Sequence, residues 1–292
     1  MVFADEQPVQ KIADILAEAR AIRALGTGIT GGEPLLRLDY VLECITALKR
    51  EFGPEHHIHL YSGILPGIGV LERLKQAGLD EIRFHPKVSE WSDPVGLKEA
   101  LLEAKASGLE AGVEIPALRS APKIVEAVRG ADAFLNLNEL EFSETNFAGL
   151  IENGFLPEDL GCGAVGSEKV AREHFLIEGI KVHYCPSRFK DAVQLRERLR
   201  RRAEGIARPF DYVSPEGTII HGIIEGDLEK ALQILMELEV PAEMYSCRDG
   251  GIDIAASILE EISEELKRVR CILSIIEKYP LENGLVVDRI PL

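Results

Sequence analysis

The feature that most constrains this fold is a regular alternation of amphipathic helices and short apolar strands over the first two thirds of the chain. Apolar residues recur at helical spacing in each helical stretch, and a glycine follows nearly every one. Because parallel neighbours need a crossover between them, this order predicts a parallel sheet with right-handed helical connections. Six strands are expected, at residues 27–30, 57–61, 81–84, 110–115, 133–138 and 180–184.

The first predicted element is a helix at residues 9–25, and no strand is predicted before it. A closed (β/α)8 barrel needs eight strands, and only six are expected here. The fold class that we predict is therefore α/β, with a parallel (β/α)6-type partial TIM barrel that lacks its first strand. We expect this domain at residues 1–206.

The pattern changes after a basic helix at residues 190–204. Residues 210–224 form two predicted strands about a Pro215-Glu216-Gly217 turn, which is typical of antiparallel pairing. We predict a separate small C-terminal α+β domain at residues 207–292. Its further elements are a helix (227–238), a strand (242–246), a long helix (254–267) and a strand pair around residues 282–284.

The composition is that of an acidic globular protein. Hydrophobic residues make up 46% of the 292 residues, and 33 basic against 49 acidic residues give a formal charge of −16. Such a surface repels phosphate backbones, which disfavours nucleic acid as a partner. No apolar run approaches the roughly 18 residues of a membrane span, and the first residues do not resemble a secretory leader, so we expect a cytoplasmic protein without a membrane partner.

The most informative motif is Gly31-Gly32-Glu33-Pro34, which directly follows the first predicted strand. Adjacent glycines remove the side chains that would keep a ligand from the main chain, and they permit backbone angles closed to other residues. At the C-terminal end of a parallel strand, such a loop lies where α/β proteins bind ligands. Taken by itself, the motif also fits an ordinary turn between a strand and a helix.

In its context of successive βα units, this motif resembles the Gly-Gly-Glu-Pro motif of radical S-adenosylmethionine (SAM) enzymes. Residues 24–61 and 183–194 look like a mostly archaeal group of that superfamily, related to pyruvate formate-lyase activating enzymes. The resemblance implies SAM and a [4Fe–4S] cluster as cofactors, with reductive cleavage of SAM to a 5′-deoxyadenosyl radical. It also implies a reductant such as ferredoxin or flavodoxin, and main-chain carbonyls of Gly31 and Gly32 that bind the SAM ammonium.

The family holds its cluster with three cysteines in a C-x3-C-x2-C loop upstream of the Gly-Gly-Glu-Pro strand, and this sequence has no such loop. The number of its cysteines is odd, five, and they are not closely spaced, so we expect mostly buried or free thiols in a reducing compartment. We interpret the chain as a radical SAM protein that lacks its cluster segment through truncation and is inactive in this form. An auxiliary cluster on Cys162 and Cys185 is the disfavoured alternative. The cysteines are Cys44, Cys162, Cys185, Cys247 and Cys271.

The carboxyl ends of the predicted strands are unusually polar. Because successive side chains on a strand point to opposite faces, we expect the same-phase set at positions 83, 85, 114, 136 and 138 to point inward. With the motif and Ser62, this set forms the predicted cofactor site, at which the resemblance implies ribose or carboxylate contacts for Glu114 and the two asparagines. The predicted cofactor-binding residues are Gly31, Gly32, Glu33, Pro34, Ser62, Arg83, His85, Glu114, Asn136 and Asn138.

Two further patterns can be interpreted either as ordinary structural features or as functional sites. His57 and His59 share a strand face, but no carboxylate or cysteine has the local spacing of a metal site, so we favour a non-metal strand with a solvated His56. The one basic patch consists of Arg188, Lys190 and the arginines of residues 196–202. We favour a solvated helix surface there over an anion site or an RNA site.

Two other functions compete with the radical SAM hypothesis. One is a cluster-free binding or scaffold protein on the same barrel. The other is an unrelated β/α-barrel enzyme that uses Glu114 and His85 for acid–base catalysis. Binding of SAM separates these two alternatives from each other. The substrate is not predicted from the sequence.

Overall fold

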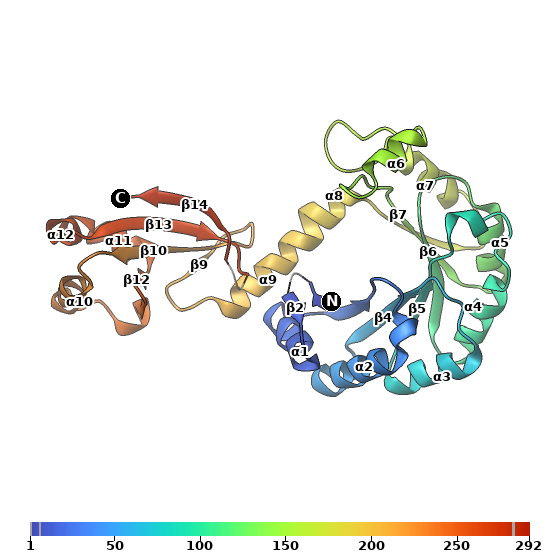
Figure 1. Cartoon of the computed structure of the whole chain (residues 1–292), viewed down its shortest axis with the longest axis horizontal. Coiled ribbons are helices and arrows are strands. Elements are labelled where there is room, and N and C mark those ends of the chain that lie inside the picture. The colour runs from blue at the N-terminus through green and yellow to red at the C-terminus, as the bar shows by residue number, and fades with distance from the viewer. Residues whose placement is uncertain (1, 6, 282–283) are drawn as a thin grey trace. The chain divides into compact units, whose positions relative to one another are not determined.

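The computed structural model describes residues 2–5, 7–281 and 284–292. The chain divides into two compact units (Figure 1). One unit is Leu25–Ala192, and the other combines Met1–Ala24 with Val193–Leu292. The predicted boundary between residues 206 and 207 remains a prediction of domain organisation. None of the described helices is long and apolar enough to cross a membrane.

The unit Leu25–Ala192 is built on a six-stranded sheet in which every neighbouring pair is parallel. Sheet order follows chain order, which confirms the predicted parallel α/β arrangement. The described strands run from β3 at one edge to β8 at the other without closure, so the partial-barrel form stays a prediction. The strands are β3 (Gly26–Ile29), β4 (His57–Ser62), β5 (Glu81–Phe84), β6 (Glu110–Pro116), β7 (Phe134–Asn138) and β8 (Lys181–Cys185).

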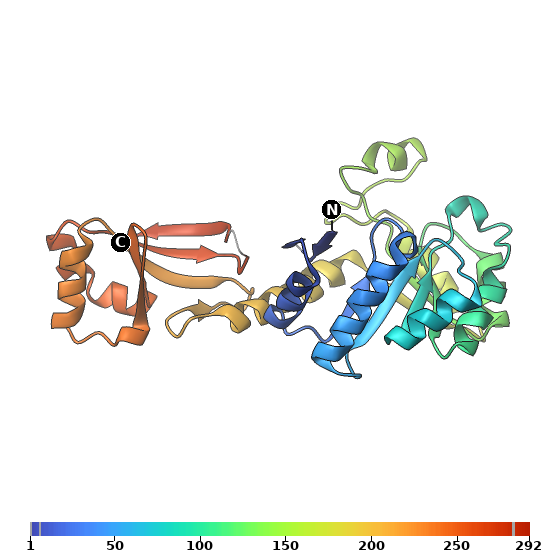
Figure 2. The same ribbon diagram turned by 60° about the horizontal axis from the view of Figure 1, so that its bottom comes forward.

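Helices connect consecutive strands and lie along one side of the sheet (Figures 1 and 2). Ile58, Leu60, Ile82 and Leu135 have no exposed surface and form the apolar face that packs under these helices. Burial of each such side chain contributes about 1.5–3 kcal/mol. The helices are η1 (Pro34–Arg37), α2 (Leu38–Phe52), α3 (Ile68–Ala77), η2 (Val88–Glu90), α4 (Leu97–Ala106), α5 (Pro122–Gly130), α7 (Ser167–Phe175) and α8 (Ser187–Phe189).

Residues 139–166, which we call the β7–α7 lobe, form an excursion that the sequence pattern did not predict. The lobe contains the short helix α6 (Phe147–Glu152), and its chain returns through the isolated bridges Glu141↔Gly163 and Pro157↔Ala164. Buried Glu139 closes its base, because its Oε2 accepts hydrogen bonds from the Ser187 N–H (2.7 Å) and hydroxyl (2.6 Å). A side chain at Gly163 would meet the Glu139 carboxylate, which explains a glycine there.

The other unit joins the N-terminal elements to a basic helix. No strand was expected before the first helix, and this was wrong, because a short hairpin of β1 (Val2–Ala4) and β2 (Gln7–Val9) leads into α1 (Ile12–Ala21). The π-helical turn η3 (Lys190–Leu195) continues into α9 (Arg196–Ile206), which packs against α1. Arg202 of α9 is buried and pairs with the buried Glu18 of α1.

Most arginines that α9 contributes to the predicted basic patch bind other groups of this unit. Arg198 pairs with Asp5 at 2.7 Å, and Arg200 pairs with Glu197 at 2.8 Å. Arg201 donates from Nε to the main-chain oxygen of Ile22. Arg198 and Arg201 therefore hold the N-terminal segment to α9, a role that the sequence did not indicate.

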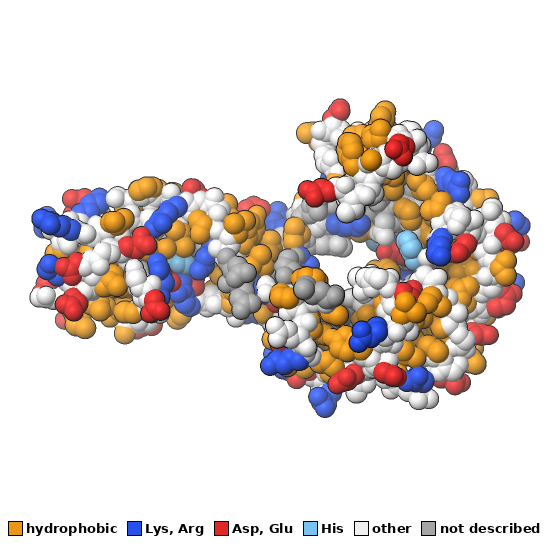
Figure 3. Space-filling view, in the orientation of Figure 1, with side chains coloured by type: hydrophobic (Ala, Val, Ile, Leu, Met, Phe, Trp, Pro, Cys, Tyr) orange, Lys and Arg blue, Asp and Glu red, His pale blue; other side chains and the backbone are white. Residues whose placement is uncertain are grey.

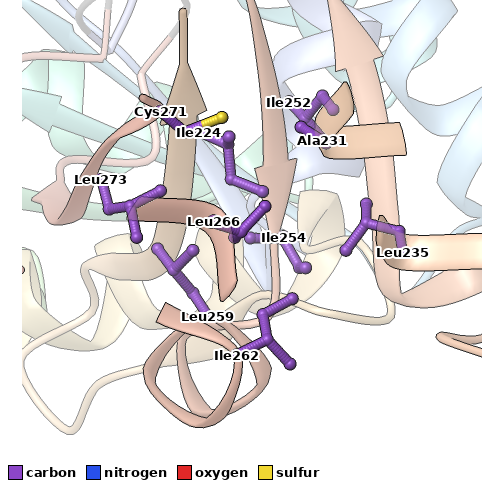
Figure 4. Packing of buried hydrophobic residues seen from close by; sticks show 10 residues of the cluster. All are labelled: Ile224, Ala231, Leu235, Ile252, Ile254, Leu259, Ile262, Leu266, Cys271 and Leu273. Carbon is purple, nitrogen blue, oxygen red and sulfur yellow. The ribbon is translucent and has the colours of Figure 1, made fainter. Parts of the chain in front are cut away.

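The C-terminal part of this unit has the β-α-β-β-α-β order of a ferredoxin-like fold. Its antiparallel sheet has the order β11-β12-β10-β13-β14, with β9 paired to β10. The core between sheet and helices contains Ile224, Ile254, Leu259 and Leu266 (Figure 4). The elements are β9 (Tyr212–Val213), β10 (Ile219–Glu225), α10 (Leu228–Glu237), η4 (Ala242–Met244), β11 (Tyr245–Arg248), β12 (Gly251–Ile254), α11 (Ala256–Glu261), α12 (Ser263–Arg268), β13 (Ile272–Lys278) and β14 (Val286–Pro291).

Two predictions for this region were wrong in detail. The single long helix predicted at 254–267 is two short helices that meet near Ile262, and it starts later than predicted because Ile254 belongs to the buried strand β12. The strand predicted at 242–246 begins three residues later, after the 3-10 turn η4. The turn predicted around residues 282–284 lies partly outside the described residues, although β13 and β14 do pair antiparallel on either side of it.

Candidate functional site

The face of the parallel sheet opposite the helices is polar, and Glu114 lies at its centre. Glu114 is buried on β6, and register places it beside Asn136 on β7. Its Oε1 accepts a hydrogen bond from Asn138 Nδ2 (2.7 Å). Its Oε2 accepts from Arg83 (2.9 Å) and from Asn136 Nδ2 (3.2 Å). Three residues of the predicted same-phase set therefore donate hydrogen bonds to the carboxylate of a fourth, Glu114.

Arg83 connects Glu114 to a second buried carboxylate. Its Nε donates to Glu81, and its terminal nitrogen also donates to the Tyr61 hydroxyl at 2.7 Å. Burial, followed by the negative charge of Glu114, raises the pKa of Tyr61 to about 12, so this hydroxyl keeps its proton at neutral pH. Glu81 and Tyr61 thus belong to the network, although they were absent from the predicted site. Their period-two spacing from Arg83 and His59 was the signal that marks them.

His59 lies beside this network as a neutral imidazole. Burial, followed by the positive charge of Arg83, lowers its pKa to about 4. Its ring contacts Tyr61 edge-on, with centroids 5.3 Å apart. A side chain on Gly28 would come within 2.7 Å of His59 Nε2, so the glycine leaves room for the ring over β3. Gly112 likewise makes room for the ring of Phe134.

The Gly31–Pro34 loop lies at the carboxyl end of β3 and has an open side. Gly31 and Gly32 have φ angles of 88° and 54°, in the left-handed region that favours glycine. Apart from the adjoining residues of the chain, no atom of the described residues lies within 4 Å of the position that a Cβ would take on either glycine. Pro34, in contrast, is buried at the start of η1. Main-chain groups of the two glycines are therefore accessible to a ligand.

Glu33 fixes this loop to the end of β4. Its carboxylate accepts from the Leu35 N–H (3.1 Å), the Ser62 hydroxyl (3.0 Å) and the Gly63 N–H (2.8 Å). Ser62 lies on the apolar face of β4, and its Oγ also accepts a hydrogen bond from the Ile64 N–H at 3.0 Å. Glu33 and Ser62, both predicted to bind cofactor, thus bind each other and brace the two strand ends.

His85 is exposed at the end of β5 and touches Glu114 through the main chain. Its Nδ1 lies 2.6 Å from the carbonyl oxygen of Glu114, whereas the carboxylate is bound by Arg83 and the asparagines. The acid–base alternative requires His85 and Glu114 to act on one substrate, and the structure gives these two groups separate hydrogen-bond partners.

The remaining histidines of this region have structural contacts. His56 was expected to be solvated, and this was wrong: it is 5% exposed, and its Nε2 lies 2.8 Å from the Thr27 hydroxyl. Its burial has a packing reason, because the ring stacks on the Phe52 ring. His57 lies 3.3 Å from Glu81. Within the described residues, no three His, Cys, Asp or Glu side chains form a group that could hold a metal ion.

Comparison with known proteins identifies the family. The chain is 37% identical to the "Putative glycyl-radical enzyme activating enzyme MJ0021" of Methanocaldococcus jannaschii over 315 aligned residues, which cover 100% of this chain and 82% of that protein. The chain belongs to the radical SAM family. Residues 217–292 match a family described as "Domain of unknown function (DUF8061)". The ferredoxin-like part of this radical SAM protein therefore corresponds to a recognised domain without an assigned role.

Proposed function

We propose that this radical SAM protein binds SAM along the carboxyl ends of β3 to β7, with its methionyl end at Gly31 and Gly32. The observation that carries the proposal is the open, left-handed glycine pair at the end of β3 in a member of this family. Two accessible main-chain carbonyls can accept hydrogen bonds from the ligand's ammonium group. Glu33 would act as a positioning residue that holds the loop open through its three hydrogen bonds.

The charge of the polar face suits a cationic ligand. Buried Glu81 and Glu114 outnumber Arg83, the cation that lies between them. SAM is positively charged at its sulfonium and at its ammonium group. A net negative, partly desolvated surface attracts such a ligand more strongly than solvent-exposed charges do.

Asn136 and Asn138 are arranged as hydrogen-bond acceptors. A carboxylate can only accept hydrogen bonds, so Glu114 binds the Nδ2 group of both amides and thereby sets their orientation. Their Oδ1 atoms remain for a ligand. They suit hydroxyl or ammonium donors, such as the ribose diol, and they repel a carboxylate. The geometry thus favours ribose contacts over carboxylate contacts for this pair.

Beside a reduced [4Fe–4S] cluster, bound SAM would supply a 5′-deoxyadenosyl radical for hydrogen abstraction from a substrate. The described residues do not fit the cluster itself, because they contain no group of three metal-ligating side chains. What these residues can do is bind SAM, orient its ribose and shield it beside the buried Arg83–Glu114 pair. The name of the relative suggests a glycyl-radical enzyme as the substrate, and we extend the proposal to such a partner, together with a ferredoxin-type or flavodoxin-type reductant.

Calorimetric titration with SAM tests the proposal. Gly32→Val should weaken SAM binding by at least about tenfold, because the branched side chain strains a left-handed backbone and covers the open side of the loop. Gly250→Val is the matched control, since Gly250 also has a positive φ, of 77°, and an open Cβ side in a turn of the other unit. The proposal fails if the unaltered protein does not bind SAM, or if Gly32→Val binds it normally.

A further inference from the structure

The β7–α7 lobe, residues 139–166, presents apolar side chains to solvent. Phe147 and Ile151 lie one turn apart on α6 and are 49% and 41% exposed. Leu156 and Val165 are neighbours on the returning chain, because the Val165 N–H donates to Leu156 O at 2.9 Å. Leu160, at the tip, is 74% exposed. Figure 3 shows hydrophobic side chains gathered on the lobe that carries α6.

These side chains belong to a compact element rather than to a loose loop. The Phe155 N–H donates to Leu150 O at 3.0 Å and folds the returning chain onto α6. The Phe147 ring contacts the buried Phe142 ring edge-on, with centroids 5.3 Å apart. An ordered element that leaves this much apolar surface in water is typical of an interaction site.

The formal charges of the lobe are all negative. Its 28 residues include six acidic residues and no Lys or Arg. Two of the six are engaged at its base, Glu139 with Ser187 and Glu141 with Lys190. Glu144, Glu152 and Asp159 are exposed beside the apolar side chains. A partner should therefore combine apolar side chains with positive charge.

The negative charge of the lobe discriminates between the molecules that could cover its apolar side chains. Nucleic acid and anionic lipid surfaces are repelled by an acidic lobe. A second copy of this chain carries a formal charge of −16, and two arginines of its basic helix are already paired, Arg200 with Glu197 and Arg202 with Glu18. A basic and apolar segment of another protein is the occupant that fits both properties.

We propose that the β7–α7 lobe is the docking surface for a protein partner that presents apolar side chains flanked by Lys or Arg. The lobe begins at Glu139, directly after Asn138 of the candidate site. A partner bound there lies next to the carboxyl ends of β7 and β8. The inference rests on the proposed function, because an activating enzyme must hold its partner enzyme beside the SAM site.

The test uses the full chain and two short labelled peptides, one of Leu and Lys at helical spacing and one of Leu and Glu, with binding followed by fluorescence anisotropy at physiological salt. The Leu/Lys peptide should bind, and the Leu/Glu peptide should not. Leu156→Ser/Leu160→Ser should weaken binding at least about tenfold, because two apolar anchors are lost. Leu176→Ser is the matched control, since Leu176 is 83% exposed outside the lobe, just after α7.

A charge series separates the lobe from the general acidity of the protein. Glu144→Gln/Glu152→Gln/Asp159→Asn should weaken binding and reduce its salt dependence, whereas neutralising three exposed glutamates of α10 and α11 should change neither. The three control positions are Glu229, Glu260 and Glu261. Hydrogen exchange with the Leu/Lys peptide bound should show new protection at residues 139–166.

Equal loss of binding in the lobe and control variants, protection outside the lobe, or equal binding of both peptides would overturn the docking assignment. Self-association of the protein that disappears in Leu156→Ser/Leu160→Ser would also overturn it, because a second copy would then cover the lobe. SAM titration of the same variants keeps the two proposals apart. Lost peptide binding with intact SAM binding supports the docking surface, and absent SAM binding refutes the proposed function alone.

Discussion

Replacement of Glu114 by Gln should break part of the hydrogen-bond network on the polar face of the parallel sheet, while the side-chain volume stays nearly the same. The carboxylate accepts three hydrogen bonds, from Asn138 (2.7 Å), Arg83 (2.9 Å) and Asn136 (3.2 Å). A glutamine offers one acceptor oxygen and places an amide donor where the second oxygen was. At least one of the three donors then faces another donor and loses its partner.

The magnitude follows from burial and charge. The Glu114 and Arg83 side chains are 10% and 19% exposed, so solvent only partly replaces the lost carboxylate. Removal of one member of a buried ion pair costs about 3–5 kcal/mol, and a hydrogen bond to a charged group contributes about 1.5–3 kcal/mol. Because Glu81 still pairs with Arg83, we expect a loss of about 2–3 kcal/mol in the free energy of unfolding.

Tryptophan fluorescence during urea unfolding measures this loss of stability for the unit Leu25–Ala192, which contains Glu114. Trp91 is the only tryptophan, is 2% exposed and lies within Leu25–Ala192, where its Nε1 donates to Pro86 O at 3.1 Å. The matched control is Glu126→Gln, which removes only an exposed pair with Lys123 and should leave the transition unchanged.

A destabilisation by Glu114→Gln of less than about 1 kcal/mol would refute the reasoning, because three donors cannot then be held by the carboxylate. The same variant should weaken SAM binding, since free rotation of the asparagine amides removes their fixed acceptor orientation. Normal SAM affinity in a destabilised variant would separate the structural role of Glu114 from the proposed binding role of the asparagines.

Two further predictions concern protonation and iron. The pKa of His59 is lowered to about 4, so the unfolded chain takes up its proton first. The stability that neutral His59 allows is therefore complete above about pH 6.5 and falls as the pH drops toward 4, and His59→Gln should reduce this slope in urea unfolding series. Equal slopes would contradict a buried neutral imidazole. The 292-residue chain reconstituted with iron and sulfide should hold no four-iron cluster, because its described residues contain no group of three metal ligands. Iron analysis that finds three to four irons per chain would show this to be wrong.

Much of the parallel sheet could be predicted from the sequence, because its signals are local. The strand predicted at 81–84 has the bounds of β5, and the strand predicted at 110–115 differs from β6 by one residue. Alternation along single strands also identified Arg83, Glu114 and the asparagines as one inward group. Glu81 and Tyr61 have the same phase but were not selected, because their importance depends on their hydrogen bonds to Arg83 from neighbouring strands.

Other features of the site depend on distant pairings that no local pattern encodes. Ser62 was chosen as a cofactor contact, but its partner is Glu33, which lies 29 residues earlier. The β7–α7 lobe was missed because a six-residue helix and two isolated bridges leave only a weak periodic signal. The role of the basic helix became visible only when Arg202 met Glu18, a pair separated by 184 residues.

The sequence by itself determined the order of the strands in the parallel sheet, the position of the Gly31–Pro34 loop and the acidic character of the chain. These properties depend on side-chain periodicity, on backbone freedom at glycine and on charge, all of which act within a few residues. Tertiary structure alone decided that Glu114 binds three donors and that Asn136 and Asn138 are turned to accept. The physical reason is that register between strands fixes which polar groups meet in a desolvated place, and each buried group must then find its partner there.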